Sequence, residues 1–466
     1  MPRILIQGGY VVTVDGARRV FDPGYVATEG QRIAAVGPSS AAPAPDDFDE
    51  VIDARGCIVV PGFINTHQHH WYNLFKGLGR GMLLERWIRE LLVPAGAQLG
   101  RAEMEVSSRL ACLEMLGTGT TTCLNHQVTS TDEALAQAIL EPVIESGMRQ
   151  VFAKEVRPQP LAEQLELAKQ VHRTWDGAGQ GRVRVALAIE STAHWVALGS
   201  SSEELILRGN DLAVQLGACI TDHIAGGTMS RDEGYLKFVI ETGRTDIEYL
   251  HRLGVLDHKW VLAHTIYPRD RDIELIVQSG ASVSHTPTSE ASRGGGITPV
   301  RRMLQAGINV CLGSDGPMVD TSVDMVEQMK AVCLFQNQLH LNPSAVTAEE
   351  ALEMATIRAA QAIGLDRELG SLEPGKRADL AVFDLQTPRS AVVHHPIVSL
   401  VHSGRGPDAR WVLCDGEMLV RDFAFVRVDF AQQRELFAEA RARALEVIER
   451  AGLKRLGAPI WPVGEP

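Results

Sequence analysis

The stretch "PGFINTHQHHWYNLFKG", residues 61–77, places three histidines directly after an apolar run. Residues 62–67 are expected to form a strand, on which side chains two positions apart point to the same side. His67 and His69 can therefore reach one metal ion, whereas Gln68 and His70 point elsewhere, and we expect His70 to line the mouth of the site. Ordinary polar residues at a strand end would give the same pattern. Further candidate ligands elsewhere in the chain are therefore needed to distinguish a metal site from this alternative.

The segments downstream repeat one rhythm, in which short apolar runs alternate with stretches of helical, 3.6-residue period. Eight strands alternating with helices over roughly 250 residues indicate a (β/α)8 barrel of the TIM type. The structural alternative is a doubly wound open sheet, but no glycine-rich phosphate loop follows a strand to support it. The predicted strands are residues 62–67, 120–125, 149–154, 183–190, 218–223, 260–264, 281–285 and 309–315.

Strand-like segments also occupy both ends of the chain, before residue 61 and after residue 370. Both ends together would build one small β-sandwich beside the barrel. We therefore predict a composite sandwich from residues 1–60 and 370–430, a barrel over residues 61–369, and a C-terminal amphipathic helix and tail over residues 431–466.

Composition limits the possible partners. The 466 residues carry a net charge of −13, which argues against nucleic acid and against an anionic membrane surface. No apolar run is long enough to span a membrane, the N-terminus does not resemble a signal peptide, and the seven scattered cysteines form no CxxC pair. We expect a cytoplasmic protein with reduced thiols.

Several predicted strands end in a possible metal ligand: His67 with His69, then His223, His264 and Asp315. The carboxyl ends of barrel strands converge on one face, so these residues should become neighbours. Imidazole and carboxylate suit Zn²⁺, Fe²⁺, Co²⁺ or Mn²⁺, and a bound dication lowers the pKa of a water towards 7. Asp315 is the expected proton carrier. His264 is either a ligand or a hydrogen-bond donor to the developing oxyanion.

The sequence resembles the metal-dependent amidohydrolase superfamily, in the branch of cytosine and guanine deaminases, adenosine-type deaminases and triazine hydrolases. The resemblance rests on "VVPGFINTHQHH", "LEMLGTGTTT", "WVLAHTIY", the "HTPTSE…GITPVRRMLQAG…LGSDG" block and "GSLEPGKRADLAVFDL". It implies a barrel with a composite β-sandwich, and a homodimer or higher homo-oligomer. It also implies one ion, most simply zinc, held by His67, His69, His223 and Asp315. His264 is then the hydrogen-bond donor to the developing oxyanion.

Two departures from this branch bear on the substrate. The deaminases of this branch usually carry H-x-x-E after the fifth strand, but here the fourth position of that motif, which begins at His223, is Gly226, and Glu290 replaces the usual Asn. Without that acid, we predict hydrolysis of a non-peptide C–N bond in a small urea, carbamate or amide, as in phenylurea and thiocarbamate hydrolases. The alternative is an aminohydrolase that releases ammonia from a purine, pyrimidine, pterin or triazine, with Glu290, Glu190 or Asp222 replacing the missing acid.

Residues near the strand ends are candidates for binding this small-molecule substrate. Each of them has a packing or hydrogen-bonding role as an alternative, and Glu190 could instead bridge two metal ions. The candidates are Trp71, His126, Glu190 and Glu290.

Overall fold

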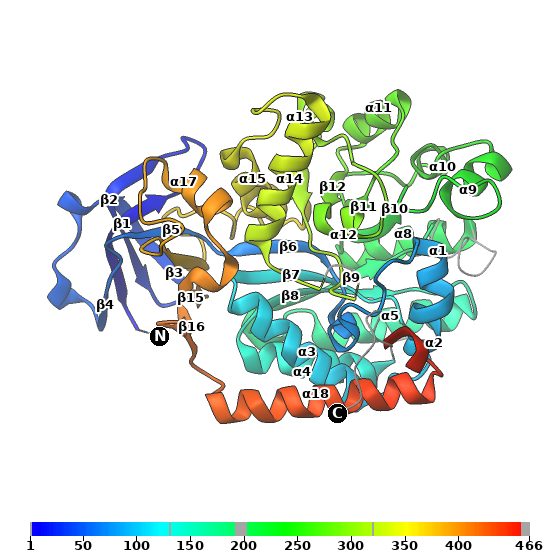
Figure 1. Ribbon diagram of the computed structural model, residues 1–466, viewed down its shortest axis with the longest axis horizontal. Coiled ribbons are helices and arrows are strands. Elements are labelled where there is room, and N and C mark those ends of the chain that lie inside the picture. Colours follow the sequence, from blue (N-terminus) through cyan, green and yellow to red (C-terminus); the bar gives the residue numbers. More distant parts are fainter. Residues whose placement is uncertain (1, 130–131, 192–202, 319–320, 458–466) are drawn as a thin grey trace, which may run out of the picture.

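The computed structural model describes residues 2–129, 132–191, 203–318 and 321–457. Within these ranges, eight parallel strands form one sheet in the order β13-β12-β11-β10-β9-β8-β7-β6, and helices surround it (Figure 1). The prediction of a (β/α)8 barrel is confirmed. The strands are β6 (Phe63–Gln68), β7 (Thr120–His126), β8 (Arg149–Glu155), β9 (Val183–Ala188), β10 (Ile220–Ile224), β11 (Trp260–His264), β12 (Ser282–His285) and β13 (Val310–Leu312).

The barrel closes where β13 meets β6. Thr66 donates its hydroxyl to the carbonyl of Leu312 at 2.9 Å, and the backbone N–H of Asp315 donates to the carbonyl of His67 at 2.9 Å. Gly313 permits this approach, because a Cβ at that position would lie 2.7 Å from Cβ of His67. Closure therefore brings the first and last strand ends of the barrel together.

The helices follow the expected alternation, and several have matching caps. Thr245 and Glu248, for example, form a reciprocal capping box at the start of α10, while α11 ends at Gly280 in the left-handed conformation. The helices are α1 (Leu84–Trp87), α2 (Val93–Gly96), α3 (Arg101–Leu116), α4 (Glu133–Ser146), α5 (Leu161–Trp175), α6 (Ala178–Gly181), α8 (Glu203–Leu216), α9 (Gly234–Thr242), α10 (Asp246–Arg252), α11 (Asp270–Ser279), α12 (Pro287–Ser292), α13 (Val300–Gln305), α14 (Met325–His340), α15 (Ala348–Ala355), α16 (Ile357–Ala362), α17 (Pro396–Val398) and α18 (Phe430–Arg450).

A second sheet is built from both ends of the chain and lies at one end of the molecule (Figure 1). Ile33 and Met418, from opposite ends of this sheet, belong to the same apolar cluster, so the sheet encloses a core of its own. Its strands, within the described residues, are β1 (Ile4–Val12), β2 (Val20–Glu29), β3 (Arg32–Pro38), β4 (Glu50–Asp53), β5 (Cys57–Pro61), β14 (Leu380–Asp384), β15 (Ala409–Cys414), β16 (Glu417–Arg421) and β17 (Ala424–Phe425).

The opening stretch passes directly from one sheet to the other, since β5 ends at Pro61 and β6 begins at Phe63. Helix α18 runs along the outside of the barrel and packs against α3 (Figure 1). The part of the tail beyond residue 457 lies outside the described residues. No described helix is both long enough and apolar enough to cross a membrane.

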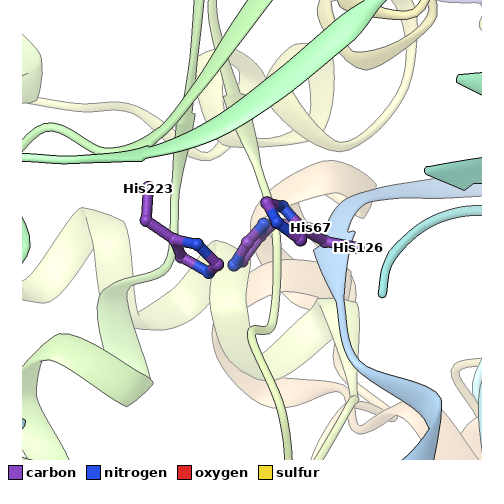
Figure 2. A group of neighbouring side chains, drawn as sticks. All are labelled: His67, His126 and His223. Atoms are coloured by element: carbon purple, nitrogen blue, oxygen red, sulfur yellow. The ribbon is translucent and has the colours of Figure 1, made fainter. Parts of the chain in front are cut away.

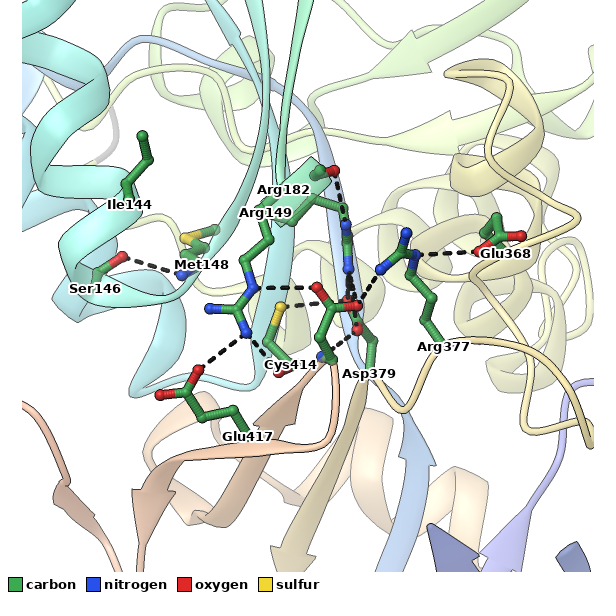
Figure 3. Close-up of polar contacts among 12 residues, drawn as sticks. Ile144, Ser146, Met148, Arg149, Arg182, Glu368, Arg377, Asp379, Cys414 and Glu417 are labelled. Atoms are coloured by element: carbon green, nitrogen blue, oxygen red, sulfur yellow. Dashed lines mark hydrogen bonds and ion pairs between the residues drawn. The ribbon is translucent and has the colours of Figure 1, made fainter. Parts of the chain in front are cut away.

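A buried group of charges joins the two sheets at the amino-terminal end of the barrel (Figure 3). Asp415, in the turn between β15 and β16, accepts from Arg149 at 2.7 Å, Arg182 at 3.1 Å and Arg377 at 2.8 Å. Arg149 also pairs with Asp379 at 3.3 Å. Breaking a buried ion pair leaves an uncompensated charge, which costs more than an exposed pair contributes.

Asp415→Asn is therefore expected to lower the free energy of unfolding by about 3 kcal/mol or more. Asparagine keeps the shape of the side chain and tolerates the left-handed φ of 52° at this position. The matched control is Asp422→Asn, which has a φ of 50° but an exposed ion pair with Arg410, and should cost less than about 1 kcal/mol. Equal urea midpoints for the two variants would contradict the buried network.

Candidate active site

Four side chains from three strand ends converge at the carboxyl-terminal end of the barrel. His69 Nε2 lies 3.2 Å and His67 Nε2 lies 3.8 Å from Oδ1 of Asp315. Figure 2 shows the rings of His67, His126 and His223 gathered together, and the centroids of His67 and His223 are 4.9 Å apart. Strands β6, β10 and β13 thus bring together the four predicted metal ligands.

The environment of His67 suits a metal ligand. Its side chain is fully buried, and neither ring nitrogen has a hydrogen-bond partner among the described residues. Burial, together with the neighbouring histidines, lowers its pKa well below the ordinary value, so the ring is neutral. Buried polar atoms without partners are rare, and a metal ion would satisfy them.

Hydrogen bonds orient the other two imidazoles. His69 donates from Nδ1 to the carbonyl of His126 at 2.5 Å, and His223 donates from Nδ1 to Glu190 at 2.7 Å. Because a carbonyl and a carboxylate only accept here, Nε2 of each ring is left free for a metal ion.

Asp315 is held in place by hydrogen bonds to both of its oxygens. Ser289 donates to Oδ2 at 2.6 Å, and the backbone N–H of Gly316 donates to Oδ1 at 2.8 Å. Burial by itself raises the pKa of Asp315, but the contact with the His69 imidazole and the nearby His264 and His67 rings hold that pKa well below its usual range. The carboxylate is therefore available as a ligand or a base.

Two strand ends at the site adopt backbone conformations that are uncommon outside glycine. His264 has a φ of 69° and Asp315 a φ of 57°. Such left-handed residues concentrate at functional sites, where the surrounding structure holds them in place. His264 Nδ1 lies 2.9 Å from the hydroxyl of Thr286, and its ring stacks beside that of His223 with centroids 5.5 Å apart.

Most of the predicted substrate-binding residues contact other side chains of the protein. Glu190 Oε1 accepts from His126 Nε2 at 2.6 Å as well as from His223. Thr221 lies 3.3 Å from the other ring nitrogen of His126, so both nitrogens are engaged within the protein. Trp71 is buried in an aromatic cluster with Tyr72 and Phe75.

Glu290 and Asp222 are likewise occupied by protein partners. Glu290 accepts from Thr298 at 2.9 Å and from His285 at 3.2 Å, and lies 3.9 Å from His264 Nδ1. Asp222 accepts from the backbone and the hydroxyl of Ser191. Each carboxylate has a structural role in this arrangement.

One expectation is wrong, and three residues were missed. His70 does not line the mouth, because it lies 2.9 Å from the hydroxyl of Ser108 on α3 and 3.6 Å from the sulfur of Cys123. Sequence reasoning missed Tyr72, Ser289 and Arg293. The ring of Tyr72 lies 4.4 Å from that of His69, and Arg293 donates to His264 at 3.3 Å. Their proximity to ligand-bearing strand ends was the only available signal.

The fold and this cluster define a metal-dependent hydrolase. The family model described as the amidohydrolase family matches residues 58–421, and the chain belongs to that family. It is thus a hydrolase that acts on C–N bonds and a member of the metal-dependent amidohydrolase superfamily.

Relatives and solved structures agree with this assignment. The chain is 33% identical to a 5′-deoxyadenosine deaminase of Methanothermobacter thermautotrophicus, over 90% of this chain and 93% of that protein. It is 31% identical to a 5-methylthioadenosine/S-adenosylhomocysteine deaminase of Syntrophobacter fumaroxidans, over 90% of this chain and 93% of that protein.

Among solved structures, a zinc-bound adenosine deaminase from Xanthomonas campestris is similar with a TM-score of 0.86 at 22% identity, covering 96% of this chain and 98% of that one. The atrazine chlorohydrolase of Arthrobacter aurescens TC1 is similar with a TM-score of 0.85 at 23% identity, and the match covers 95% of this chain and 100% of that one. At these identities the structural likeness concerns the fold.

Proposed function

We propose that this protein is an aminohydrolase that releases ammonia from an amino-substituted heterocycle, of which a 5′-deoxyadenosine-type nucleoside is the leading candidate. The similarity to purine nucleoside deaminases over nine-tenths of both chains carries this proposal. It favours the alternative of our sequence-based prediction over urea or carbamate hydrolysis.

The metal site of the proposal consists of His67, His69, His223 and Asp315. The partnerless ring nitrogens of His67 and the free Nε2 atoms of the other two rings fit a Zn²⁺ ion, which prefers nitrogen and carboxylate ligands. One ion is proposed, because His126 has both ring nitrogens engaged. When bound, the ion lowers the pKa of a water molecule, so that hydroxide forms at neutral pH.

The chain supplies the proton transfers around this water. Asp315 accepts the proton of the attacking water and returns it to the departing amine, while Ser289 holds its second oxygen. His264, beside the ligand His223, donates to the developing negative charge. Both roles need a rigid geometry, which the hydrogen bonds at the strand ends provide.

The position of Gly226 favours a second candidate, hydrolysis of the carbonyl C–N bond of a urea, carbamate or anilide. A Cβ at Gly226 would lie 3.2 Å from Cδ2 of His264, so an acidic side chain at this position would lie directly beside the ring of His264. Glycine offers none. A carbonyl does not need ring protonation, and Asp315 alone can pass a proton to the leaving nitrogen.

A product screen on zinc-loaded protein separates the two candidates. 5′-Deoxyadenosine, S-adenosylhomocysteine, pterins and aminotriazines are incubated beside phenylureas, carbamates and anilides, and both ammonia and free aniline or alkylamine are quantified. Ammonia from a heterocycle supports the aminohydrolase. Aniline or alkylamine without ammonia refutes it and supports the second candidate.

Glu190→Gln is expected to weaken metal binding by about 10- to 100-fold, because Glu190 fixes the ring of the proposed ligand His223. Competition with a chromogenic chelator measures the zinc affinity. The control is Glu203→Gln, an exposed change on α8. Unchanged affinity in the Glu190 variant would show that this carboxylate does not support the metal site.

A further inference from the structure

Arg293 stands beside the proposed reaction centre and has no role in the steps above. It follows α12 in the loop after β12, and its side chain is only 8% exposed. One guanidinium nitrogen, Nη2, donates to Nδ1 of His264 at 3.3 Å. Its Nε is buried and has no hydrogen-bond partner among the described residues.

This buried cation lacks a carboxylate partner within the part of the chain that the structure describes. The acid nearest in sequence, Glu290, is engaged instead by Thr298 and His285. A buried guanidinium is costly unless its donors are used, and arginine cannot become neutral to avoid the cost. An acceptor brought by the substrate would supply the missing partner.

The contact with His264 also decides which nitrogen of that ring carries the proton. Arginine only donates, so Nδ1 of His264 must accept, and Nε2 therefore bears the hydrogen. Arg293 and His264 thus form a pair of donors, of which His264 lies next to Gly226.

We propose that Arg293 binds the substrate by donating to an acceptor atom bonded to the carbon that water attacks. The substrate class is then a planar group with such an acceptor, either an sp² ring nitrogen or a carbonyl oxygen. This inference rests on the proposed function and deepens it, because it assigns to Arg293 the activation that Gly226 does not supply.

In deamination, water adds to the amino-bearing carbon and the electron pair of the C=N bond moves to the ring nitrogen, against the guanidinium. The pair returns to re-form the C=N bond as the amine leaves as ammonia with the proton that Asp315 carries. The hydroxyl that remains on the carbon then loses its proton to the ring nitrogen, which gives the carbonyl form of the product. Arg293 stabilises the charge without giving up a proton, since its pKa is too high for proton transfer.

The affinities of paired probes for zinc-loaded protein test this role separately from product formation. Purine riboside is compared with 1-deazapurine riboside, which lacks the ring nitrogen, and acetanilide is compared with N-ethylaniline, which lacks the carbonyl. Calorimetry on the wild type should show one pair in which the acceptor-bearing member binds about 10- to 100-fold more tightly. The pair that responds identifies the substrate class.

Arg293→Ala should abolish that difference while leaving the affinity for the acceptor-free probe and the zinc content unchanged. Arg293→Lys should retain part of the affinity difference between the two probes. Added guanidinium should restore part of this difference in Arg293→Ala. The control Arg302→Ala removes an exposed arginine of α13 that pairs with Asp270, and should keep the full difference.

The outcomes keep the two proposals apart. Discrimination in the anilide pair alone would refute the aminohydrolase but support the role of Arg293 if the Ala variant loses that discrimination. Discrimination that persists in Arg293→Ala, or a wild type that discriminates in neither pair, would overturn the role of Arg293. Ammonia release in the product screen would then still stand by itself.

Discussion

His69→Ala and His223→Ala are each expected to lose bound metal and activity together. Each change removes one of the four side chains that meet at the barrel mouth, so the ion loses an imidazole ligand and only water can replace it. Zinc affinity should fall by more than about 100-fold, a larger loss than for a residue that only orients a ligand. Metal analysis after dialysis and the initial rate on the same samples measure both effects.

Folding has to be separated from metal loss in these variants. His251→Ala, an exposed change on α10, provides the matched control and should keep both zinc and activity. Circular dichroism should be alike for all three variants. A variant that retained full activity without metal would contradict the site assignment.

Asp315→Asn is expected to lower kcat by about 10³- to 10⁴-fold or more, because the amide cannot accept the proton of the attacking water. The shape of the side chain is conserved, and asparagine tolerates the left-handed φ of 57° at this position. The fold should therefore persist, as judged by the urea midpoint. Steady-state kinetics at saturating zinc measure the loss of turnover separately from weaker metal binding.

The exposed Asp270→Asn on α11 is the comparison for this variant, since it removes one carboxylate far from a strand end. It should leave kcat within about twofold of the wild-type value. Near-wild-type turnover in Asp315→Asn, with zinc bound, would refute Asp315 as the proton carrier and leave it at most a ligand.

Periodicity made the barrel predictable. Eight apolar runs separated by helical stretches correspond to the eight parallel strands, and the run at residues 260–264 has the same limits as β11. The ends of the strands were less predictable. The apolar run at residues 309–315 was expected to form one strand, but β13 spans only three residues. Beyond Leu312 the chain leaves the sheet, and Asp315 then adopts a left-handed φ of 57° with its carboxylate 3.8 Å from Nε2 of His67.

The candidate site was partly predictable for the same reason. In a closed parallel barrel, a histidine or aspartate that ends a strand must lie near the others, so His67, His223 and Asp315 could be grouped without coordinates. Side chains that approach from loops and neighbouring helices carry no such periodic signal. The contacts of Ser289 with Asp315 and of Arg293 with His264 became visible only in three dimensions.

The sequence by itself determined the fold class, the family resemblance and the set of strand-end ligands, because these follow from local patterns repeated along the chain. Only the tertiary structure decided the hydrogen-bond partners, such as Glu190 on His223 and Ser108 on His70. It also showed that Gly226 stands beside His264 and that Arg293 is buried without an acid among the described residues. Such contacts join residues distant in sequence, and their geometry depends on loop conformations that no periodicity encodes.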